Sequence, residues 1–356
     1  RVQARFPEPA ATGAEFQALR LIAPHSGDPV CDPAQWLFLD TETTGLSGGT
    51  GTYAFLVGLG WWEEGKFVVE QVFMRNHAEE PSLLLDVLER LGQRRVLVTF
   101  NGKSFDWPLL VTRFQMTRTG PAPEPLAHLD LLHPARQIWR LSLKSVALTS
   151  LERHVLGFHR GSDIPSETIP QRYFEFLRGG PSEPMVEVFR HNQMDIRGLA
   201  VLALRIAGLL ADPAAPGCGA GELFGISRLL QRRGHASLAG QMYRKALEEG
   251  LPESAEPVAC RELATLAKRS SDFELANSLW NRLLGDSREG WKAYEQLAIY
   301  YEHRASQPRQ AESLSREALV KLQESFRAGR VSTRRYRQLH ASFQHRLKRL
   351  SSKISG

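Results

Sequence analysis

The sequence has few cysteines and no long apolar run. Its three cysteines, Cys31, Cys218 and Cys260, are widely spaced and odd in number, so neither a disulfide framework nor a zinc knuckle is expected. No apolar stretch reaches the roughly 18–20 residues of a membrane span. The first residues also lack the basic, apolar and small-residue series of a signal peptide. The chain begins at Arg1 rather than Met, so a lost leader stays open. We expect a cytoplasmic protein without a membrane partner.

Acidic residues are absent from the last part of the chain. Residues 327–356 contain nine Lys and Arg and no Asp or Glu, which leaves 36 basic and 39 acidic residues elsewhere. The formal charge of +6 therefore comes from this tail. A basic tail fits phosphate binding. It fits a solvated helix end equally well.

Apolar residues are plentiful enough for a sizeable core, since 42% of the 356 residues are hydrophobic. This length predicts two or three domains. Residues 1–34 are rich in Pro, Ala and Gly without periodicity, so we expect an irregular lead-in. Residues 212–221 have the composition of a linker. These boundaries predict one domain over 35–211 and a helical domain over 222–356.

The first of these domains mixes strands and helices. Trp36–Asp40 and Arg95–Phe100 are short apolar runs typical of buried strands. Tyr53–Trp62 and Lys66–Met74 predict a hairpin around a Gly-containing turn. Helical spacing is found in the segments Glu80–Gly92, Phe105–Phe114, Leu143–Leu156 and Glu183–Leu210. The pattern predicts a mixed α/β fold with an antiparallel hairpin after its first strand.

The helical domain repeats itself. Leu238–Leu247 resembles Leu275–Leu284 at an offset of 37 residues, and Ala311–Leu319 is a third copy 35 residues later. Small and aromatic residues recur together, so we favour tetratricopeptide-like helix pairs over three unrelated amphipathic helices. Such arrays usually dock a protein partner. The alternative is that the basic end guides nucleic acid.

Two carboxylates end the first predicted strand. Asp40 and Glu42 are separated by one residue, so both side chains point to the same face of the strand. Neighbouring carboxylates repel one another unless a cation is present. An Asp-x-Glu sequence is common, however, and alone it fits a solvated strand end.

Two further carboxylates occur later in the chain. Asp106 falls in the first turn of a predicted helix, where the helix dipole favours any acidic residue. His191 and Asp195 are four residues apart on a late helix and share a face. Each feature alone fits an ordinary surface or packing residue. Their combination and order are far more specific.

This order resembles the DEDD superfamily of ribonuclease H-like 3′–5′ exonucleases. Asp40–Leu46 reads Asp-Thr-Glu-Thr-Thr-Gly-Leu and matches the first motif of that superfamily, and Asn101-Gly102 with Phe105-Asp106 matches the second. The chain is also similar to the YprB-like branch of bacterial proteins, through Gly48–Gly58, His128–Leu132 and His191-Asn192. The resemblance covers about half the chain. It implies a ribonuclease H-like mixed sheet with helices, followed by the repeats.

The resemblance also implies a site. Asp40, Glu42, Asp106 and Asp195 would bind two divalent ions, Mg²⁺ or Mn²⁺, and hydrolyse phosphodiester bonds of DNA or RNA. His191 has the spacing of the superfamily's Tyr rather than its His. It would orient or deprotonate the attacking water, or be a packing histidine. Weaker substrate contacts are expected from Thr43, Thr44, Leu46, Asn101, Lys103 and Asp130.

The expected activity is a 3′–5′ exonuclease on single strands. A structure-specific endonuclease is one alternative, and a non-catalytic binding scaffold is another. Nothing in the sequence separates DNA from RNA, and no aromatic cluster of the kind that stacks bases is evident.

Overall fold

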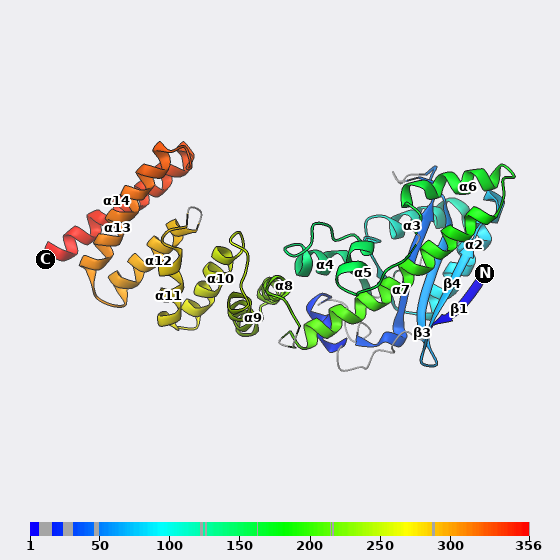
Figure 1. The fold of residues 1–356 in the computed structure, drawn as a ribbon, viewed down its shortest axis with the longest axis horizontal. Helices are drawn as coiled ribbons and strands as arrows, with labels where there is room; N and C mark the ends of the chain where they lie inside the picture. The colour runs from blue at the N-terminus through cyan, green and yellow to red at the C-terminus, as the bar shows by residue number, and fades with distance from the viewer. Residues whose placement is uncertain are drawn as a thin grey trace. The chain divides into compact units, whose positions relative to one another are not determined.

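The computed structural model describes residues 1–6, 16–23, 31–45, 50–121, 124, 127–161, 163–213, 215, 217–286 and 289–355. It divides into two compact units, Arg1–Cys218 and Gly219–Gly356. The first unit holds a mixed sheet with helices, and the second is helical (Figure 1). The predicted fold class is confirmed. None of the helices among the described residues has the length and hydropathy that a membrane crossing requires.

The first unit is built on a six-stranded sheet with the order β1-β4-β3-β2-β5-β6. The strands are β1 Val2–Phe6, β2 Trp36–Thr43, β3 Ala54–Glu63, β4 Lys66–Phe73, β5 Val96–Thr99 and β6 Ala127–Asp130. The β1–β4, β4–β3 and β3–β2 pairs are antiparallel, whereas the β2–β5 and β5–β6 pairs are parallel. Glu64 and Gly65 form the predicted hairpin turn with φ of 51° and 74°. Positive φ at both central residues suits the twist of a two-residue hairpin.

Part of the expected irregular lead-in is a strand. Residues 2–6 form β1 and pair antiparallel with β4 from Val2–Gln71 to Phe6–Phe67. The sequence did not indicate this strand because its partner lies more than 60 residues away. As an edge strand, β1 buries little of itself, so its sequence needs no apolar alternation.

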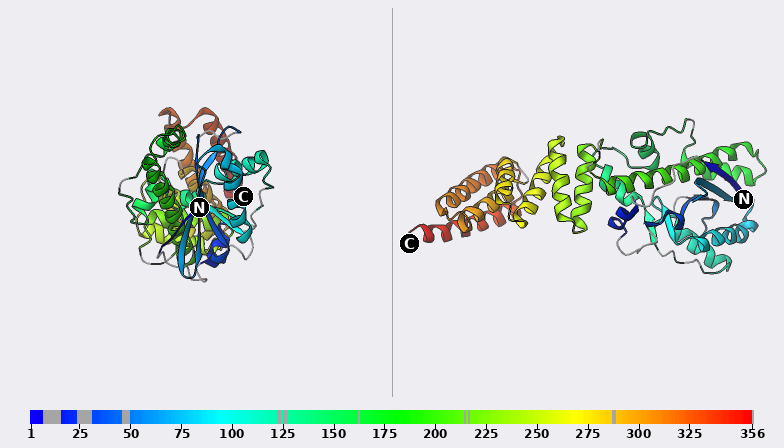
Figure 2. Two further views of the ribbon diagram at one scale, coloured as in Figure 1. Left: turned by 90° about the vertical axis from the view of Figure 1, so that its right-hand side faces the viewer. Right: turned by 90° about the horizontal axis from the view of Figure 1, so that it is seen from below.

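Helices cover both faces of the sheet. They are α2 Glu80–Gln93, α3 Asp106–Thr117, α4 Leu132–Trp139, α5 Leu148–His154, α6 Ile169–Leu177 and α7 Glu183–Ala211, with short 3₁₀ turns at Gln17–Leu21, Pro33–Gln35, His77–Glu79 and Ser166–Thr168. Leucines of α2 and α3 pack with Leu37 and Leu39 of β2. The helix predicted over 143–156 begins later, because the Ser145 hydroxyl accepts the Ala147 N–H in a turn just before it. The strands lie between the helical layers (Figure 2, left).

Helix α7 lies on the opposite face from α2 and α3, and two glycines of β3 let it come close. A Cβ on Gly58 would lie 2.3 Å from Asn192 Oδ1, and one on Gly60 would lie 2.5 Å from Ile196 Cγ2. Any larger side chain at either position would push the helix away from the sheet. The glycines therefore set the distance between α7 and the end of β2.

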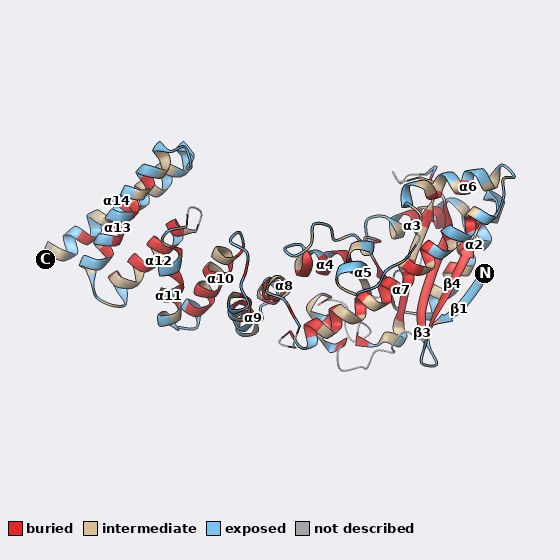
Figure 3. Ribbon diagram, viewed as in Figure 1, coloured by how far each residue is buried: buried red, intermediate tan, exposed pale blue. Residues whose placement is uncertain are grey.

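The second unit consists of consecutive packed helices. They are α8 Ala220–Arg232, α9 Ala236–Glu248, α10 Glu256–Arg269, α11 Phe273–Leu283, α12 Gly290–His303, α13 Pro308–Arg327 and α14 Thr333–Ser355. The three repeated segments lie on α9, α11 and α13, the second helix of each successive pair. Equivalent positions in each are buried (Figure 3 draws buried residues in red). Their spacing of three and four residues places them on one face of each helix. The buried positions are Ala239, Met242, Tyr243 and Ala246, then Ala276, Leu279, Trp280 and Leu283, then Ala311, Leu314, Ser315 and Ala318.

The basic tail is a helix that is partly neutralised inside this unit. Helix α14 packs on α13 and α12. The carboxylate of Glu302 on α12 is fully buried and accepts from Arg346, Arg349 and Lys353 at 2.6 to 3.2 Å. These cations hold the pKa of Glu302 at about 2 despite its burial. Three of the nine basic residues of the tail therefore serve packing.

Candidate active site

Asp40 and Glu42 lie at the end of β2 on the face that α7 covers. Asp40 is opposite Gly58 in the register of β2 and β3. Asn192 of α7 fills the space above this glycine, and its Nδ2 donates to Asp40 Oδ2 at 2.9 Å. Gln71 of β4 in turn donates to Asn192 Oδ1 at 2.9 Å. This chain of amides fixes the orientation of the Asp40 carboxylate.

Asp106 is the first residue of α3 and reaches the same end of β2 from the other side of the sheet. The hydroxyl of Thr41, which alternates to that side, donates to Asp106 Oδ1 at 2.5 Å. Thr41 thus links Asp106 to β2, the strand that carries Asp40 and Glu42.

The loop that leads to Asp106 is held by Asp130. This carboxylate ends β6, is 6% exposed, and accepts the backbone N–H groups of Asn101 at 2.8 Å and Lys103 at 3.1 Å. Asn101 has φ of 68°, so the chain turns sharply there. Asp130 therefore supports the turn from behind and is not a surface residue at a strand end.

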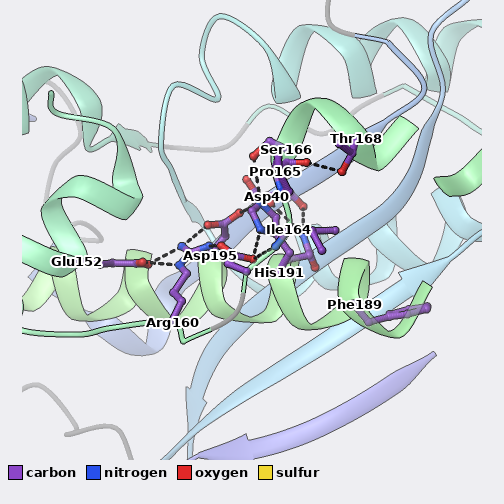
Figure 4. Close-up of polar contacts among 12 residues, drawn as sticks. Asp40, Glu152, Arg160, Ile164, Pro165, Ser166, Thr168, Phe189, His191 and Asp195 are labelled. Atoms are coloured by element: carbon purple, nitrogen blue, oxygen red, sulfur yellow. Dashed lines mark hydrogen bonds and ion pairs between the residues drawn. The ribbon is translucent and has the colours of Figure 1, made fainter. Parts of the chain in front are cut away.

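His191 and Asp195 lie on one face of α7, as predicted, within a network of charges (Figure 4). His191 Nδ1 is 2.7 Å from Asp163 Oδ1, and its Nε2 is 3.3 Å from Asp195 Oδ2. Arg160 donates to Asp195 Oδ1 at 2.5 Å, to Asp163 at 3.1 Å and to both oxygens of Glu152. The side chains of Arg160 and Glu152 are 6% and 1% exposed, so this is a buried ion cluster.

These groups converge on a cleft of about 660 Å³. Its lining includes all five residues predicted as catalytic, namely Asp40, Glu42, Asp106, His191 and Asp195. Apolar and hydroxyl side chains complete the walls, among them Thr43, Phe105, Pro108, Ile169 and Ser166. Phe105 is 55% exposed and offers an aromatic face, although the sequence shows no aromatic cluster of the kind that stacks bases. The cleft is therefore acidic at its floor and partly apolar at its rim.

The weaker predicted contacts have different positions. Thr43 and Asn101 line the cleft, whereas Thr44, Lys103 and Asp130 do not. The hydroxyl of Thr44 instead accepts the N–H of Tyr53. Leu46 lies outside the described residues.

The carboxylates destabilise one another. Burial raises the pKa of Asp40 and of Glu42 well above their usual range, and the charges of Asp195 and Asp106 raise both further. Burial raises the pKa of Asp106 to about 6 although the Thr41 hydroxyl opposes this. Within the described part of the chain, Asp40, Glu42 and Asp106 have no ion pair. Repulsion between converging buried carboxylates is what a bound divalent cation removes.

The residues present therefore fit divalent metal ions. Oxygen ligands from Asp and Glu suit Mg²⁺ and Mn²⁺. Glu42, His191 and Asp195 each offer a ligand atom, and these atoms all lie within 4.8 Å of one another. Asp40 and Asp106 open into the same cleft.

Most of the residues that support the site belong to no motif that the sequence displays. Arg160, Glu152, Asp163 and Gln71 received no role, and Asn192 was noted only as part of a motif. Glu152, Arg160 and Asp163 are close to one another in the chain but distant from His191 and Asp195, and Gln71 lies on β4, so no local spacing could link them to the predicted residues. Gly198 of α7 is a weak local sign of the buried cluster, because a Cβ at this position would lie 1.9 Å from Glu152 Oε1.

Comparison with known proteins agrees with this architecture. Residues 37–207 match the model of the RNase_H superfamily. The chain is 29% identical over 286 residues to the uncharacterized protein YprB of Bacillus subtilis (strain 168). The aligned region covers 79% of this chain and 68% of YprB. Residues 37–207 of the first unit are thus similar to RNase H-like domains, and this similarity points to a nuclease that uses divalent metal ions.

Proposed function

We propose that this protein is a 3′–5′ exonuclease of the DEDD type that acts on single-stranded DNA or RNA. The observation that carries the proposal is the convergence of Asp40, Glu42, Asp106 and Asp195 on one cleft, three of them without an ion pair among the described residues. The match to the RNase_H superfamily supports hydrolysis of a nucleic acid. Polarity from the 3′ end rests on the motif resemblance.

In this proposal the four carboxylates hold two divalent ions, Mg²⁺ or Mn²⁺. Such ions lower the pKa of the attacking water and stabilise charge on the leaving oxygen. The protein's own contribution is positioning. Asn192 and Gln71 fix the floor carboxylate Asp40, and Thr41 fixes Asp106. The rim, with Thr43 and Phe105, borders the terminal nucleotide, where an aromatic ring can stack on a base of any sequence.

End-labelled DNA and RNA, each single and double stranded, test this activity with Mg²⁺ or Mn²⁺. We expect stepwise loss of 3′-terminal nucleotides from single strands. Asp40→Ala should abolish it, while Asp86→Asn, a carboxylate on α2 that pairs with Arg1, should leave it intact. Full activity of Asp40→Ala would exclude the proposed site.

Two other functions have distinct outcomes. A structure-specific endonuclease would cut a circular or 3′-blocked substrate, which an exonuclease cannot start on. A non-catalytic scaffold would show no heat of Mn²⁺ binding in calorimetry and no cleavage. The circular substrate therefore separates an exonuclease from an endonuclease.

For the second unit we propose tetratricopeptide-like repeats that dock a protein. Support comes from the recurrence of small and apolar buried positions on α9, α11 and α13, with a buried aromatic residue at the same position of α9 and α11. The alternative is that α14 binds nucleic acid through Arg334, Arg335 and Arg337, which are exposed and do not contact Glu302. Replacing these three by Gln tests this without disturbing the packing of α14.

If α14 contacts phosphates, the triple variant should lower the dependence of log affinity on log salt by up to about two to three units, since each lost phosphate contact contributes roughly 0.7–0.9. An unchanged slope assigns the unit to protein docking instead.

A further inference from the structure

We infer that His191 is itself a ligand of a metal ion, together with Glu42 and Asp195. The inference rests on the proposed function, because it concerns the same site. It differs from the role that the sequence suggested, in which His191 orients or deprotonates water. Two features of the site support it: the direction of the imidazole nitrogens and the position of Asp195 (Figure 4).

The first feature is that Asp163 determines which nitrogen carries the proton. Its carboxylate oxygen lies 2.7 Å from His191 Nδ1, and an ionised carboxylate can only accept. Arg160 pairs with Asp163 at 3.1 Å, and the N–H of Ile164 donates to it at 3.0 Å, so the carboxylate stays ionised and in place. When the imidazole is neutral, Nδ1 therefore carries the proton, and the Nε2 lone pair points into the cleft.

The second feature is that this lone pair meets another acceptor. Asp195 Oδ1 accepts a hydrogen bond from Arg160, and Asp195 Oδ2 lies 3.3 Å from His191 Nε2. A ring nitrogen and a carboxylate oxygen at this distance form a pair of ligand atoms that one cation can bind. The hydroxyl of Ser166 is 3.4 Å from the same nitrogen, too far for a strong hydrogen bond. A cation bound by both atoms would take the place of a proton between them.

The spacing of the two atoms suits one ion. Ligands at about 2.1 Å in adjacent octahedral positions are about 3 Å apart, close to the distance observed between Nε2 and Oδ2. Residues four apart on a helix share one face, and this spacing lets two side chains of H-E-x-x-H helices bind one metal. Glu42 supplies a third atom within 4.8 Å of both.

Asp163, held by Arg160, would then orient His191 as a metal ligand. A metal-ligating histidine commonly donates its other N–H to a carboxylate, which fixes its tautomer and orientation. His191 is 5% exposed, so its ring cannot turn to replace this contact. An imidazole ligand at one metal position also affects the choice of ion, because it favours Mn²⁺ and other transition metals over Mg²⁺.

Pulsed electron paramagnetic resonance on the Mn²⁺-loaded full chain tests the inference without any nuclease assay. We expect ¹⁴N modulation from a coordinated imidazole, which changes to the ¹⁵N pattern when the histidines are isotopically labelled. The modulation should vanish in His191→Ala and persist in His133→Ala, an exposed histidine on α4. Calorimetry should show Mn²⁺ affinity at one site reduced at least tenfold in His191→Ala, with a smaller loss for Mg²⁺.

Asp163→Ala should weaken Mn²⁺ binding about 10–100-fold, as expected for loss of a carboxylate behind a ligand, with Asp163→Asn intermediate because its carbonyl still accepts. If the wild type binds Mn²⁺ without ¹⁴N modulation, or with unchanged affinity in His191→Ala, the inference is wrong and the carboxylate site stands. If no Mn²⁺ binds at all, both the inference and the proposed function fail.

Discussion

Replacing Asp106 by Asn should stabilise the protein when no metal is bound. The Asp106 carboxyl is half-buried, and its pKa rises from an ordinary value of 3.8 to about 6. A rise of about two pKa units corresponds to about 3 kcal/mol against the ionised form. Allowing for partial exposure and coupling to the other carboxylates, we expect the neutral amide to gain about 2 kcal/mol at pH 8.

The pH dependence follows from the direction of the shift. A carboxyl with a raised pKa in the folded state contributes stability that is fully present below pH 3.8 and lost as pH rises through about 6. Metal-free wild type should therefore lose stability over that interval. Asp106→Asn should not lose this part, because its amide does not titrate and its carbonyl still accepts from Thr41.

Thermal unfolding with a chelator at pH 8 and pH 4 measures this. A gain of about 2 kcal/mol should raise Tm of a domain of this size by about 4–8 °C at pH 8, and the gain should disappear at pH 4. Added Mn²⁺ should reverse the order, because the wild type binds it better.

Asp130→Asn is the matched control. Asp130 accepts three backbone N–H groups, so the same substitution there should destabilise by about 1–3 kcal/mol. If Asp106→Asn is no more stable than the wild type at pH 8, or keeps its advantage at pH 4, burial of the ionised Asp106 carboxylate is not the cause.

Three further outcomes are expected. Gly58→Ala should lower nuclease activity at least tenfold, measured on a 3′-labelled strand, because the added Cβ displaces Asn192 from its carboxylate partner; unchanged activity would show that this contact is dispensable. Arg160→Gln should lower the free energy of unfolding by about 3–5 kcal/mol in urea, because it leaves Glu152 buried and unpaired, and a loss below 1 kcal/mol would contradict the buried cluster. Glu302→Gln should speed hydrogen exchange in α14, whose cations lose their shared partner; equal exchange rates would mean that apolar packing alone holds this helix.

The sequence predicted the regular elements well where the pattern was local. The β3–β4 hairpin followed from its turn residues and two apolar strands. Helix α7 was predicted to within one residue at each end, because a long apolar periodicity leaves little ambiguity. The edge strand β1 was not predicted, since its pairing is with a distant segment and its own residues are exposed.

In the site, too, the residues could be predicted from local motifs, whereas their surroundings could not. Asp40, Glu42, Asp106, His191 and Asp195 were chosen from motifs, and the fold brings all five to one cleft. The direction of each side chain was beyond the sequence. Alternation on β2 placed Asp40 and Glu42 on one face, but only the packing of α7 put an amide against one of them.

The sequence by itself determined which carboxylates belong together, because their types and order are written in short motifs at the ends of regular elements. Only the tertiary structure decided what surrounds them. Arg160 and Asp163 come from an irregular segment with no periodicity, and their meeting with His191 and Asp195 depends on how closely α7 approaches the sheet. Gly58 and Gly60 set that distance because they have no Cβ atom. The sequence does not show this effect, since it depends on Asn192 and Ile196 of α7 lying directly opposite the two glycines in the folded protein.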